Sequence, residues 1–333
     1  MKPTITIGLA GDVMLGRTLD PVMNARGYDY PWGNMLAVMR DTDMNIINLE
    51  TTFTISNDRA EKTFNFKAAP DKITSLQHAH ISVANLANNH VLDFGAEGLL
   101  ETTRTLRHAG IPYVGAGQDI AEASQPVVIA KNNIRVGVLG ITDNEPEWKA
   151  TDRPGTHYVD PENREEHLAL FHAVAALRKE ADIVIVSIHW GPNMREKPTQ
   201  HFVEFAHRLS QHGAHVIHGH SAHILQGIEL YNKSLILYDT GDFVDDYRVD
   251  DGLRNDLAAF FILEAEQEGL LDLTIMPTRI HQYQVNKAGP EDHAWIMNRI
   301  RRLSEDLGTH IPGEGRIHLK PGSKEIEAAS VTP

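Results

Sequence analysis

Short apolar runs alternate with amphipathic segments through the first two thirds of the chain. The apolar runs are rich in Ile, Leu and Val, as is typical of buried strands, and they occupy residues 4–10, 44–49, 81–87, 135–141, 183–188 and 214–217. Between them, apolar positions recur every three or four residues, which predicts helices at residues 71–79, 97–109, 163–180 and 199–211. Strands that alternate with helices predict an α/β fold with crossover connections.

The pattern changes after His223, where strand-like runs follow one another with only short polar turns. These runs predict mostly antiparallel strands at residues 224–231, 234–239, 256–264, 271–276 and 279–285. An amphipathic helix is then expected, with Gly308 as its stop signal. We therefore predict one domain over residues 1–308, followed by a tail at 309–333 that frays from about residue 320. Its predicted parts are an alternating part (1–223), a strand-rich part (224–286) and a C-terminal helix (290–307).

Composition favours a soluble globular protein. The chain has 333 residues, of which 41% are hydrophobic, and this is enough to bury a substantial core. No window approaches the roughly 18 to 20 consecutive apolar residues that a membrane span needs. The first residues lack the charged, apolar and small-residue sections of a signal peptide, so we expect a cytoplasmic location and no membrane span.

Charge and cysteine content limit the possible partners and cofactors. The formal net charge of -14 argues against nucleic acid or an anionic membrane as a partner. An anionic substrate would need a local positive centre, which a divalent ion supplies. Because Cys is absent, any metal must be held by His, carboxylate, amide or water, which points to ions such as Zn, Mn, Fe or Mg.

A cluster of histidines is the most informative local feature. His218, His220 and His223 crowd one short segment, predicted as a loop, after the apolar run 214–217. Imidazole is the commonest ligand for borderline metals. Some clustering is expected by chance among 19 histidines, so the segment alone is equally consistent with a metal site and with a solvated loop.

Polar residues at the ends of the predicted strands strengthen the case for a metal. In an open α/β sheet, ligands bind beyond the carboxyl ends of the strands. Potential ligands at successive strand ends are Asp12, Glu50, Asn88 and Asn89 with His90, His189, and the histidine cluster. Each residue alone also suits an ordinary structural role, such as a turn or a satisfied core position. Together, carboxylate, amide and imidazole suit a dinuclear centre, with Glu50 as the bridging carboxylate.

Six motifs, in their order along the chain, resemble those of the poly-γ-glutamate capsule biosynthesis (CapA) family, which is related to the calcineurin-like metallophosphoesterases. The resemblance runs from about residue 4 to residue 308, and it implies a layered, metallophosphoesterase-like β-sandwich flanked by helices. The matching segments are 11–17, 48–50, 66–68, 88–90 with Asp93, 189–191, and 219–223 before 238–243.

The resemblance also implies roles for individual residues. Asp12 would hold one metal, Glu50 would bridge, and Asn89 with His189 would hold the second metal. His220 and His223 would complete the two sets of ligands. His90 is similar to the catalytic histidine that faces the leaving group, and Asp93 would orient it.

The chain departs from the phosphoesterase pattern at two positions. Met14 stands where those enzymes commonly have a histidine, and Ala222 stands where the second imidazole of the Gly-His-x-His motif would fall. These departures predict that one of the two metal sites is weak, rearranged or empty.

Four further residues are candidates for substrate binding. Arg17 and Lys67 lie in family-like motifs and suit a phosphate or carboxylate group, although a cation on a loop is often only solvated. Trp190 is expected either to line the pocket or to pack in the core. Asp242 follows a predicted strand and is expected to face the site.

Two functions remain open from the sequence. The first is a metal-dependent hydrolase that uses one or two divalent ions (Mn, Zn or Fe), in which activated water attacks a phosphoester or a glutamyl amide of poly-γ-glutamate. The second is a non-catalytic assembly or binding protein of capsule synthesis, since a family name that describes a pathway does not specify a reaction. In either case the partner is a small or polymeric anion, and the sequence does not indicate the oligomeric state.

Overall fold

The computed structural model describes residues 2–313 and 315–320 and has a mixed α/β fold with two larger sheets. The strands of the nine-stranded sheet are β1 (Ile5–Val13), β2 (Met44–Leu49), β5 (Ile81–Asn85), β6 (Tyr113–Val114), β15 (Asp242–Val244), β16 (Leu257–Glu266), β17 (Gly269–His281), β18 (Gln284–Lys287) and β19 (Arg316–His318). Their order is β18-β17-β16-β1-β2-β5-β6, with β15 paired to β1 and β19 paired to β17.

The second large sheet has six strands in the order β13-β14-β12-β11-β9-β8. Their bounds are β8 (Val127–Lys131), β9 (Ile134–Thr142), β11 (Ile183–His189), β12 (Val216–His220), β13 (Ile228–Tyr231) and β14 (Ser234–Leu237). Two small sheets pair β3 (Thr52–Phe53) with β4 (Lys67–Ala68), and β7 (Ala116–Gly117) with β10 (Gly155–Thr156).

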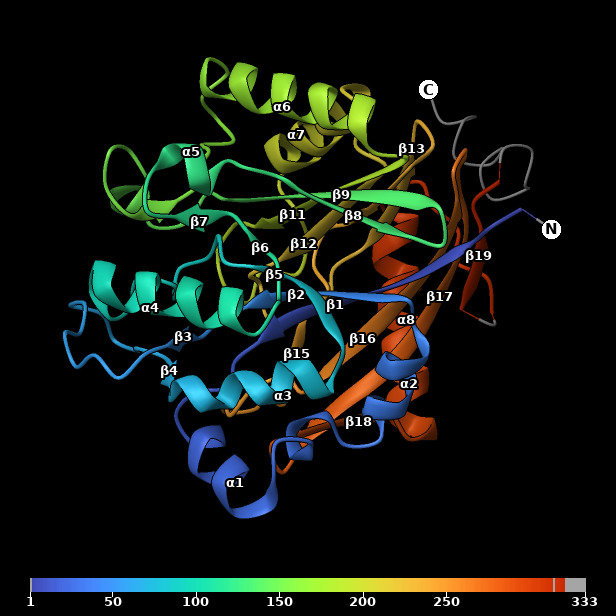
Figure 1. Ribbon diagram of the computed structural model, residues 1–333. Coiled ribbons are helices and arrows are strands. Elements are labelled where there is room, and N and C mark those ends of the chain that lie inside the picture. The colour runs from blue at the N-terminus through green and yellow to red at the C-terminus, as the bar shows by residue number, and fades with distance from the viewer. Residues whose placement is uncertain (1, 314, 321–333) are drawn as a thin grey trace.

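Helices cover the outer sides of the two larger sheets. The α-helices are α1 (Leu19–Arg26), α2 (Met35–Asp41), α3 (Ile73–His78), α4 (Gly95–His108), α5 (Ile120–Ala123), α6 (Glu166–Glu180), α7 (Gln200–Gln211) and α8 (Pro290–Glu305). Short 3₁₀ turns are η1 (Tyr30–Trp32), η2 (Pro70–Lys72) and η3 (Pro146–Trp148). Figure 1 shows α3 and α4 on one outer side and α6 and α7 on the opposite side. Within the described part of the chain, no helix is long and apolar enough to cross a membrane.

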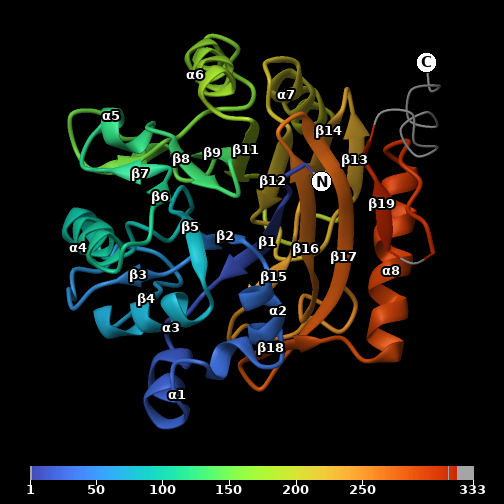
Figure 2. The ribbon, with the colours of Figure 1, turned by 45° about the vertical axis from the view of Figure 1, so that its right-hand side comes forward.

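Three buried clusters hold these layers together. The first contains residues of both large sheets, such as Leu9 and Ile46 on one and Val138 and Ile185 on the other, so the sheets face each other across it. The second packs α1 to α4 against the nine-stranded sheet, and the third packs α6 and α7 against the six-stranded sheet. Helix α8 lies beside β17 and β19 and adds Ile300 to the first cluster (Figure 2).

The alternating part of the chain matches its hydrophobic pattern closely. The predicted strands correspond to β1, β2, β5, β9, β11 and β12, and the predicted helices to α3, α4, α6 and α7. Strand β11 is buried along its whole length, which explains why its sequence is apolar on both faces from Ile183 to Val186 rather than alternating. The prediction of crossover connections is confirmed by the parallel pairing of β1 with β2 and of β9 with β11.

One strand extends further than its apolar run indicates. The sequence predicted a strand that ends at residue 217 and a histidine loop after it, but β12 continues through His218 and His220. Its backbone pairs with β11 on one side and with β14 on the other. Because this pairing satisfies the backbone on both sides, polar side chains do not end the strand. Only His223 of the cluster lies in the loop.

The strand-rich part is mostly antiparallel, as predicted, but several boundaries were wrong. β13 begins at Ile228 rather than at residue 224, and β17 runs without a break from Gly269 to His281, across the expected gap between 271–276 and 279–285. The expected strand 279–285 is divided by a two-residue turn at Gln282 and Tyr283, where φ is 51° and 65°. Positive φ at both positions is typical of a tight hairpin turn, which joins β17 to β18. After α8, Gly308 has φ 74°, consistent with its predicted role as the stop.

The last described residues add one more strand. β19 pairs with β17 inside the segment 309–333 that the sequence assigned to a tail. The fraying predicted from residue 320 falls almost entirely outside the described residues.

Candidate metal centre

The ends of five strands, drawn from both large sheets, meet at one buried point. Asp12 on β1 lies in register with Asn48 on β2 and Asp242 on β15. On the other sheet, His189 at the end of β11 is in register with His220 at the end of β12. Asp12 Oδ1 is 3.7 Å from Nδ1 of both histidines. The carboxylates of one sheet therefore meet the imidazoles of the other.

The first group of potential ligands consists of Asp12, His189 and His220, all buried. His189 Nε2 lies 3.0 Å from Asn89 Oδ1, and His220 Nε2 lies 3.0 Å from Ser187 Oγ. If each Nε2 donates to its oxygen partner, both Nδ1 atoms carry lone pairs, yet they are only 3.0 Å apart.

A cation between the two Nδ1 atoms would remove this contact, as would the tautomer in which Ser187 Oγ donates to His220 Nε2 and His220 Nδ1 donates to His189 Nδ1. Ligands of a tetrahedral zinc ion about 2 Å away lie about 3.3 Å from one another, close to the separations seen here. Burial also lowers the pKa of both His189 and His220, so both rings are neutral, which is the form that binds metal. The first group therefore fits a divalent ion that prefers imidazole.

The second group consists of Asp12, Glu50, His223 and Asp242, whose donor atoms all lie within 4.8 Å of one another. His223 Nδ1 is 2.8 Å from Asp242 Oδ1 and 3.2 Å from Asp12 Oδ2. Both carboxylate oxygens of Glu50 and one of Asp242 are buried without a hydrogen-bond partner among the described residues. Because an unpaired buried carboxylate is costly, this group also fits a divalent cation.

The electrostatics of the second group show the same need for positive charge. Burial, together with the Asp12 carboxylate, raises the pKa of Glu50 well above its usual range, and burial does the same for Asp242. Although burial alone lowers the pKa of His223, the carboxylates of Asp242 and Glu50 raise it well above normal. A bound metal ion would replace the proton on His223 as the compensating charge.

The two groups assign the expected ligands differently from the sequence. Asp12 belongs to both groups, whereas the sequence placed Glu50 in the bridging position. Asp242, expected at the substrate, lies in the second group. Asn89 contacts His189 through the ring nitrogen that faces away from Asp12, so it is placed to orient that ring.

Asn48 is a site residue that lies in the matching segment 48–50 but to which the sequence assigned no role. Its Oδ1 accepts hydrogen bonds from Asn85 and Asn88, both at 3.1 Å, so its Nδ2 faces the centre. That Nδ2 donates to Asp12 Oδ1 at 2.7 Å and lies 3.2 Å from His189 Nδ1. The signal that points to Asn48 is its position at the end of β2, beside Asp12.

His90 lies next to the second group. Its Nδ1 is 2.6 Å from Asp93 Oδ2, and its Nε2 is 3.4 Å from Glu50 Oε1. The ring stacks on Phe66 at a centroid distance of 3.9 Å. Burial, partly opposed by Asp93, lowers the pKa of His90 to about 4. His90 is therefore a neutral, oriented imidazole directed at the candidate ligands.

Arg17 lies at the rim of the centre. Its guanidinium lies 5.3 Å from the centroid of the Phe66 ring and 3.2 Å from Asp246 Oδ1. Tyr247, the residue after Asp246, packs its ring against His223 at 5.3 Å. Arg17 thus stands above the aromatic side chains that cover His90 and His223.

The other two expected substrate contacts are engaged elsewhere. Lys67 Nζ donates to Ser56 O at 2.5 Å and to Asn57 Oδ1 at 2.9 Å, which ties it to its own loop. Trp190 is 5% exposed, and its Nε1 donates to the Tyr238 carbonyl at 2.8 Å. This side chain packs in the third core cluster.

Met14 and His218, to which the sequence assigned no ligand role, lie in the core. Met14 is fully buried, with Sδ 3.2 Å from the backbone nitrogen of Gly16. His218 Nδ1 lies 3.3 Å from Ser187 Oγ, and burial lowers the pKa of His218 to about 4. Ser187 thus contacts both His218 and His220.

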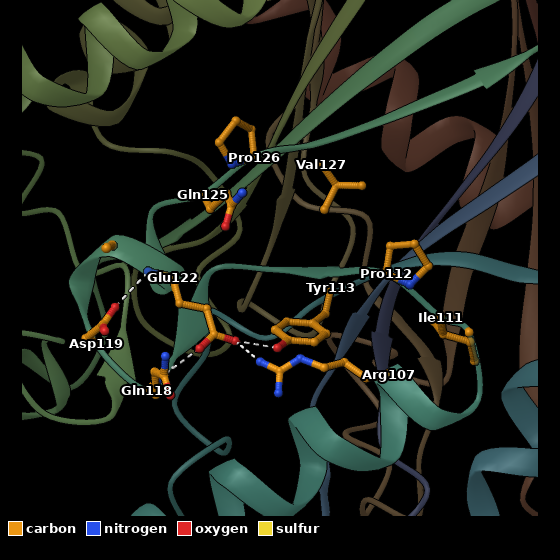
Figure 3. A pocket seen from close by; sticks show the side chains of 12 residues that line it. Arg107, Ile111, Pro112, Tyr113, Gln118, Asp119, Glu122, Gln125, Pro126 and Val127 are labelled. Carbon is orange, nitrogen blue, oxygen red and sulfur yellow. Dashed lines mark hydrogen bonds and ion pairs between the residues drawn. The ribbon is translucent and has the colours of Figure 1, made fainter.

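A surface cavity of about 760 Å³ lies among α4, β6, α5 and β8, and its lining includes no residue of the two ligand groups (Figure 3). Glu122 accepts hydrogen bonds there from Tyr113 Oη at 2.5 Å and the Gln118 amide at 3.0 Å, and it also pairs with Arg107. These polar groups satisfy one another, unlike those of the candidate metal centre, where buried carboxylate oxygens lack a hydrogen-bond partner among the described residues.

Known proteins provide an independent comparison. Residues 6–247 match the family model described as bacterial capsule synthesis protein PGA_cap. A probable polyglutamine synthesis accessory protein of Mycobacterium tuberculosis is 34% identical, with 92% of this chain and 93% of the relative covered. The capsule biosynthesis protein CapA of Bacillus anthracis is 28% identical, with 91% and 73% covered.

A solved structure shares the fold. The crystal structure of a hypothetical protein from Thermus thermophilus aligns with a TM-score of 0.50 at 15% identity, covering 83% of this chain and 100% of that chain. The family match and the close relatives confirm the resemblance that the six motifs indicated. The chain therefore belongs to the bacterial capsule synthesis protein family PGA_cap, whose relatives include the CapA proteins.

Proposed function

We propose that this protein is a metal-dependent hydrolase of the metallophosphoesterase type, acting on a phosphoester or on a glutamyl amide in capsule metabolism. The observation that carries the proposal is the pair of buried ligand groups that share Asp12. We also propose that the two facing sheets and their outer helices correspond to the layered metallophosphoesterase sandwich.

The residues present fit two divalent ions of different preference. Asp12, His189 and His220 would hold an ion that favours imidazole, such as Zn or Fe. Asp12, Glu50, His223 and Asp242 would hold an ion that favours oxygen, such as Mn. A divalent ion held there would lower the pKa of a bound water molecule towards neutrality, so that hydrolysis would need no serine or cysteine nucleophile.

The surrounding side chains suit the proton transfer of a hydrolysis. His90 is directed at the ligands by Asp93 and is placed to exchange a proton with the leaving group. Arg17 at the rim supplies positive charge for an anionic substrate in a chain whose net charge is -14. The matching family is described as capsule synthesis protein PGA_cap, and one relative is named for polyglutamine synthesis, which supports a glutamyl polymer as the substrate.

One observation favours the second candidate, a non-catalytic assembly or binding protein. The six residues of the two ligand groups are at most 3% exposed, so the centre is closed to solvent. A closed metal centre without an open coordination position is typical of a structural site. In this alternative the ions stabilise the junction of the two sheets.

The decisive experiment measures metal and turnover together. The protein is purified without chelator, its metal content is determined by mass spectrometry, and hydrolysis of bis-p-nitrophenyl phosphate and of poly-γ-glutamate is assayed with added Mn or Zn. Stoichiometric metal with hydrolysis of either substrate supports the hydrolase. Stoichiometric metal without hydrolysis selects the structural alternative, and absence of both contradicts the proposed metal centre.

A further inference from the structure

We propose that Lys62 is a positioning residue, which acts through Asp93 to hold the His90 imidazole in one orientation and one tautomer. Lys62 lies in the segment between β3 and β4, and no motif in the sequence singles it out. The inference rests on the proposed function only for its effect on turnover, because the state of the His90 ring can be measured in an inactive protein.

The segment around Lys62 wraps around Asp93. The Ala60 amide donates to the Asp93 carbonyl at 2.9 Å, and the Phe66 amide donates to Asp93 Oδ2 at 2.7 Å. Lys62 Nζ is 3.2 Å from Asp93 Oδ1 and also donates to the Asn89 carbonyl. Asp93 is 0% exposed, so these contacts determine its orientation.

This arrangement assigns the proton on His90. Asp93 accepts from the Lys62 ammonium at one oxygen and from the Phe66 amide at the other. A carboxylate that accepts at both oxygens offers its remaining lone pair to His90 Nδ1, 2.6 Å away, so Nδ1 is the donor. His90 Nε2 then presents its lone pair towards Glu50 Oε1, 3.4 Å away.

Lys62 also joins the two halves of the molecule. Its Nζ lies 3.4 Å from Glu145 Oε1 and 4.6 Å from the centroid of the Trp148 ring. Both residues belong to the segment that follows β9 of the six-stranded sheet, whereas Asp93 follows β5 of the nine-stranded sheet. The ammonium therefore links Asp93 to Glu145 and Trp148 on the opposite side of the centre.

The same contacts favour a positioning role for Lys62 over direct binding of the substrate. The side chain of Lys62 is 19% exposed, and its ammonium already contacts two carboxylates and one carbonyl. Without the Lys62 ammonium, Asp93 Oδ1 would lose this charged donor in a buried setting, which is costly for a carboxylate. Asp93 would then shift, and the bond that fixes His90 Nδ1 would weaken.

Lys67 offers a matched control in the same segment. Its ammonium binds Ser56 O and Asn57 Oδ1 and lies 4.7 Å from the centroid of the Phe94 ring, and none of these contacts is to Asp93 itself. Lys67→Met therefore removes a cation and loosens the loop without touching the His90 support. Lys62→Met removes the contact to Asp93, and Lys62→Arg keeps a cation at this position. If the Met variant does not fold, Lys62→Gln replaces it as the neutral variant.

The test is long-range ¹H–¹⁵N NMR of the histidine side chains, recorded first without added metal and then with Zn. The His90 signals are identified as those that disappear in the variant His90→Gln. Wild type and Lys67→Met are expected to show a His90 ring protonated at Nδ1. Lys62→Met, or Lys62→Gln in its place, is expected to show averaged nitrogen shifts from two tautomers, and Lys62→Arg is expected to restore the wild-type pattern. An unchanged His90 pattern in the neutral variant would overturn the proposal.

Turnover gives the second readout if the wild type is active. Supporting residues behind a site typically change activity by about 10- to 100-fold, so Lys62→Met is expected to lower kcat by that factor with KM within about twofold. A large rise in KM with unchanged kcat would mean that Lys62 contacts substrate instead. An inactive wild type would contradict the hydrolase, while the NMR result would still decide the role of Lys62.

Discussion

The two sheets contribute chemically different halves to one centre. In the nine-stranded sheet, β1 and β2 lead to the carboxylates Asp12 and Glu50, and β15 begins with Asp242. In the six-stranded sheet, β11 and β12 end in His189 and His220. Oxygen ligands suit harder ions and imidazoles suit borderline ions. Neither sheet alone carries a complete set of ligands, so the centre depends on how the two sheets pack.

The residue common to both halves is expected to show the largest effect. Asp12→Asn removes the carboxylate that belongs to both ligand groups while keeping the size of the side chain. We expect metal affinity to fall by more than about 10²-fold at both sites and turnover to be lost. Metal content after gel filtration measures this, with the exposed Asp250→Asn as a control. Retention of one full equivalent of metal would show that the two groups do not share Asp12.

Substitutions confined to one half are expected to remove one ion and spare the other. His189→Ala should weaken binding of Zn, because it removes one of two imidazoles from the first group. Asp242→Asn should weaken binding of Mn, because it removes an oxygen ligand from the second group. Competition titrations with Zn and Mn on both variants compare the two losses. Equal loss of both ions in both variants would mean that the halves do not act as separate sites.

His90 adjoins the carboxylate half without belonging to either ligand group. His90→Ala is expected to leave the metal content unchanged and to lower kcat by about 10²- to 10⁴-fold, the usual effect of losing a general acid or base. Steady-state kinetics with parallel metal analysis provide the measurement. Full activity in this variant would exclude His90 from the reaction.

The smallest expected effect on function concerns the stability of the six-stranded half. His157 is 8% exposed and lies 3.0 Å from the Gly140 carbonyl through Nδ1, and burial lowers its pKa to about 4 from an ordinary 6.5. Between these values the unfolded chain binds a proton that the folded chain does not, so the free energy of unfolding rises with pH. The full contribution is present above about pH 6.5 and is lost as pH falls towards 4, by at most about 3 kcal/mol.

Urea denaturation at pH 7.5, 6 and 5 tests this sign, with His157→Gln as the comparison. The variant is expected to lose part of the pH dependence and to keep its metal content at pH 7.5. An identical pH profile in both proteins would assign the dependence to other groups.

The local hydrophobic pattern was sufficient to predict the elements that are buried evenly along their length. Strands β2 and β11 are buried throughout, so their apolar runs coincide closely with the strands. The hydrophobic pattern was insufficient where backbone pairing with a neighbouring strand extends a strand through polar residues, as at His218 and His220 in β12. It also failed to separate β17 from β18, because the turn residues Gln282 and Tyr283 lack the usual Asn-Gly signal.

The sequence by itself determined the family, the types of donor and the strand ends at which they occur. Strand ends are local features, and the order of the six motifs is read directly from the chain. Only the tertiary structure decided that Asp12 belongs to both ligand groups, that Asp242 lies beside it, and that Asn48 and Lys62 support the centre. The reason is physical: distances between residues far apart in the chain depend on sheet register and on the packing of two sheets, neither of which local periodicity encodes.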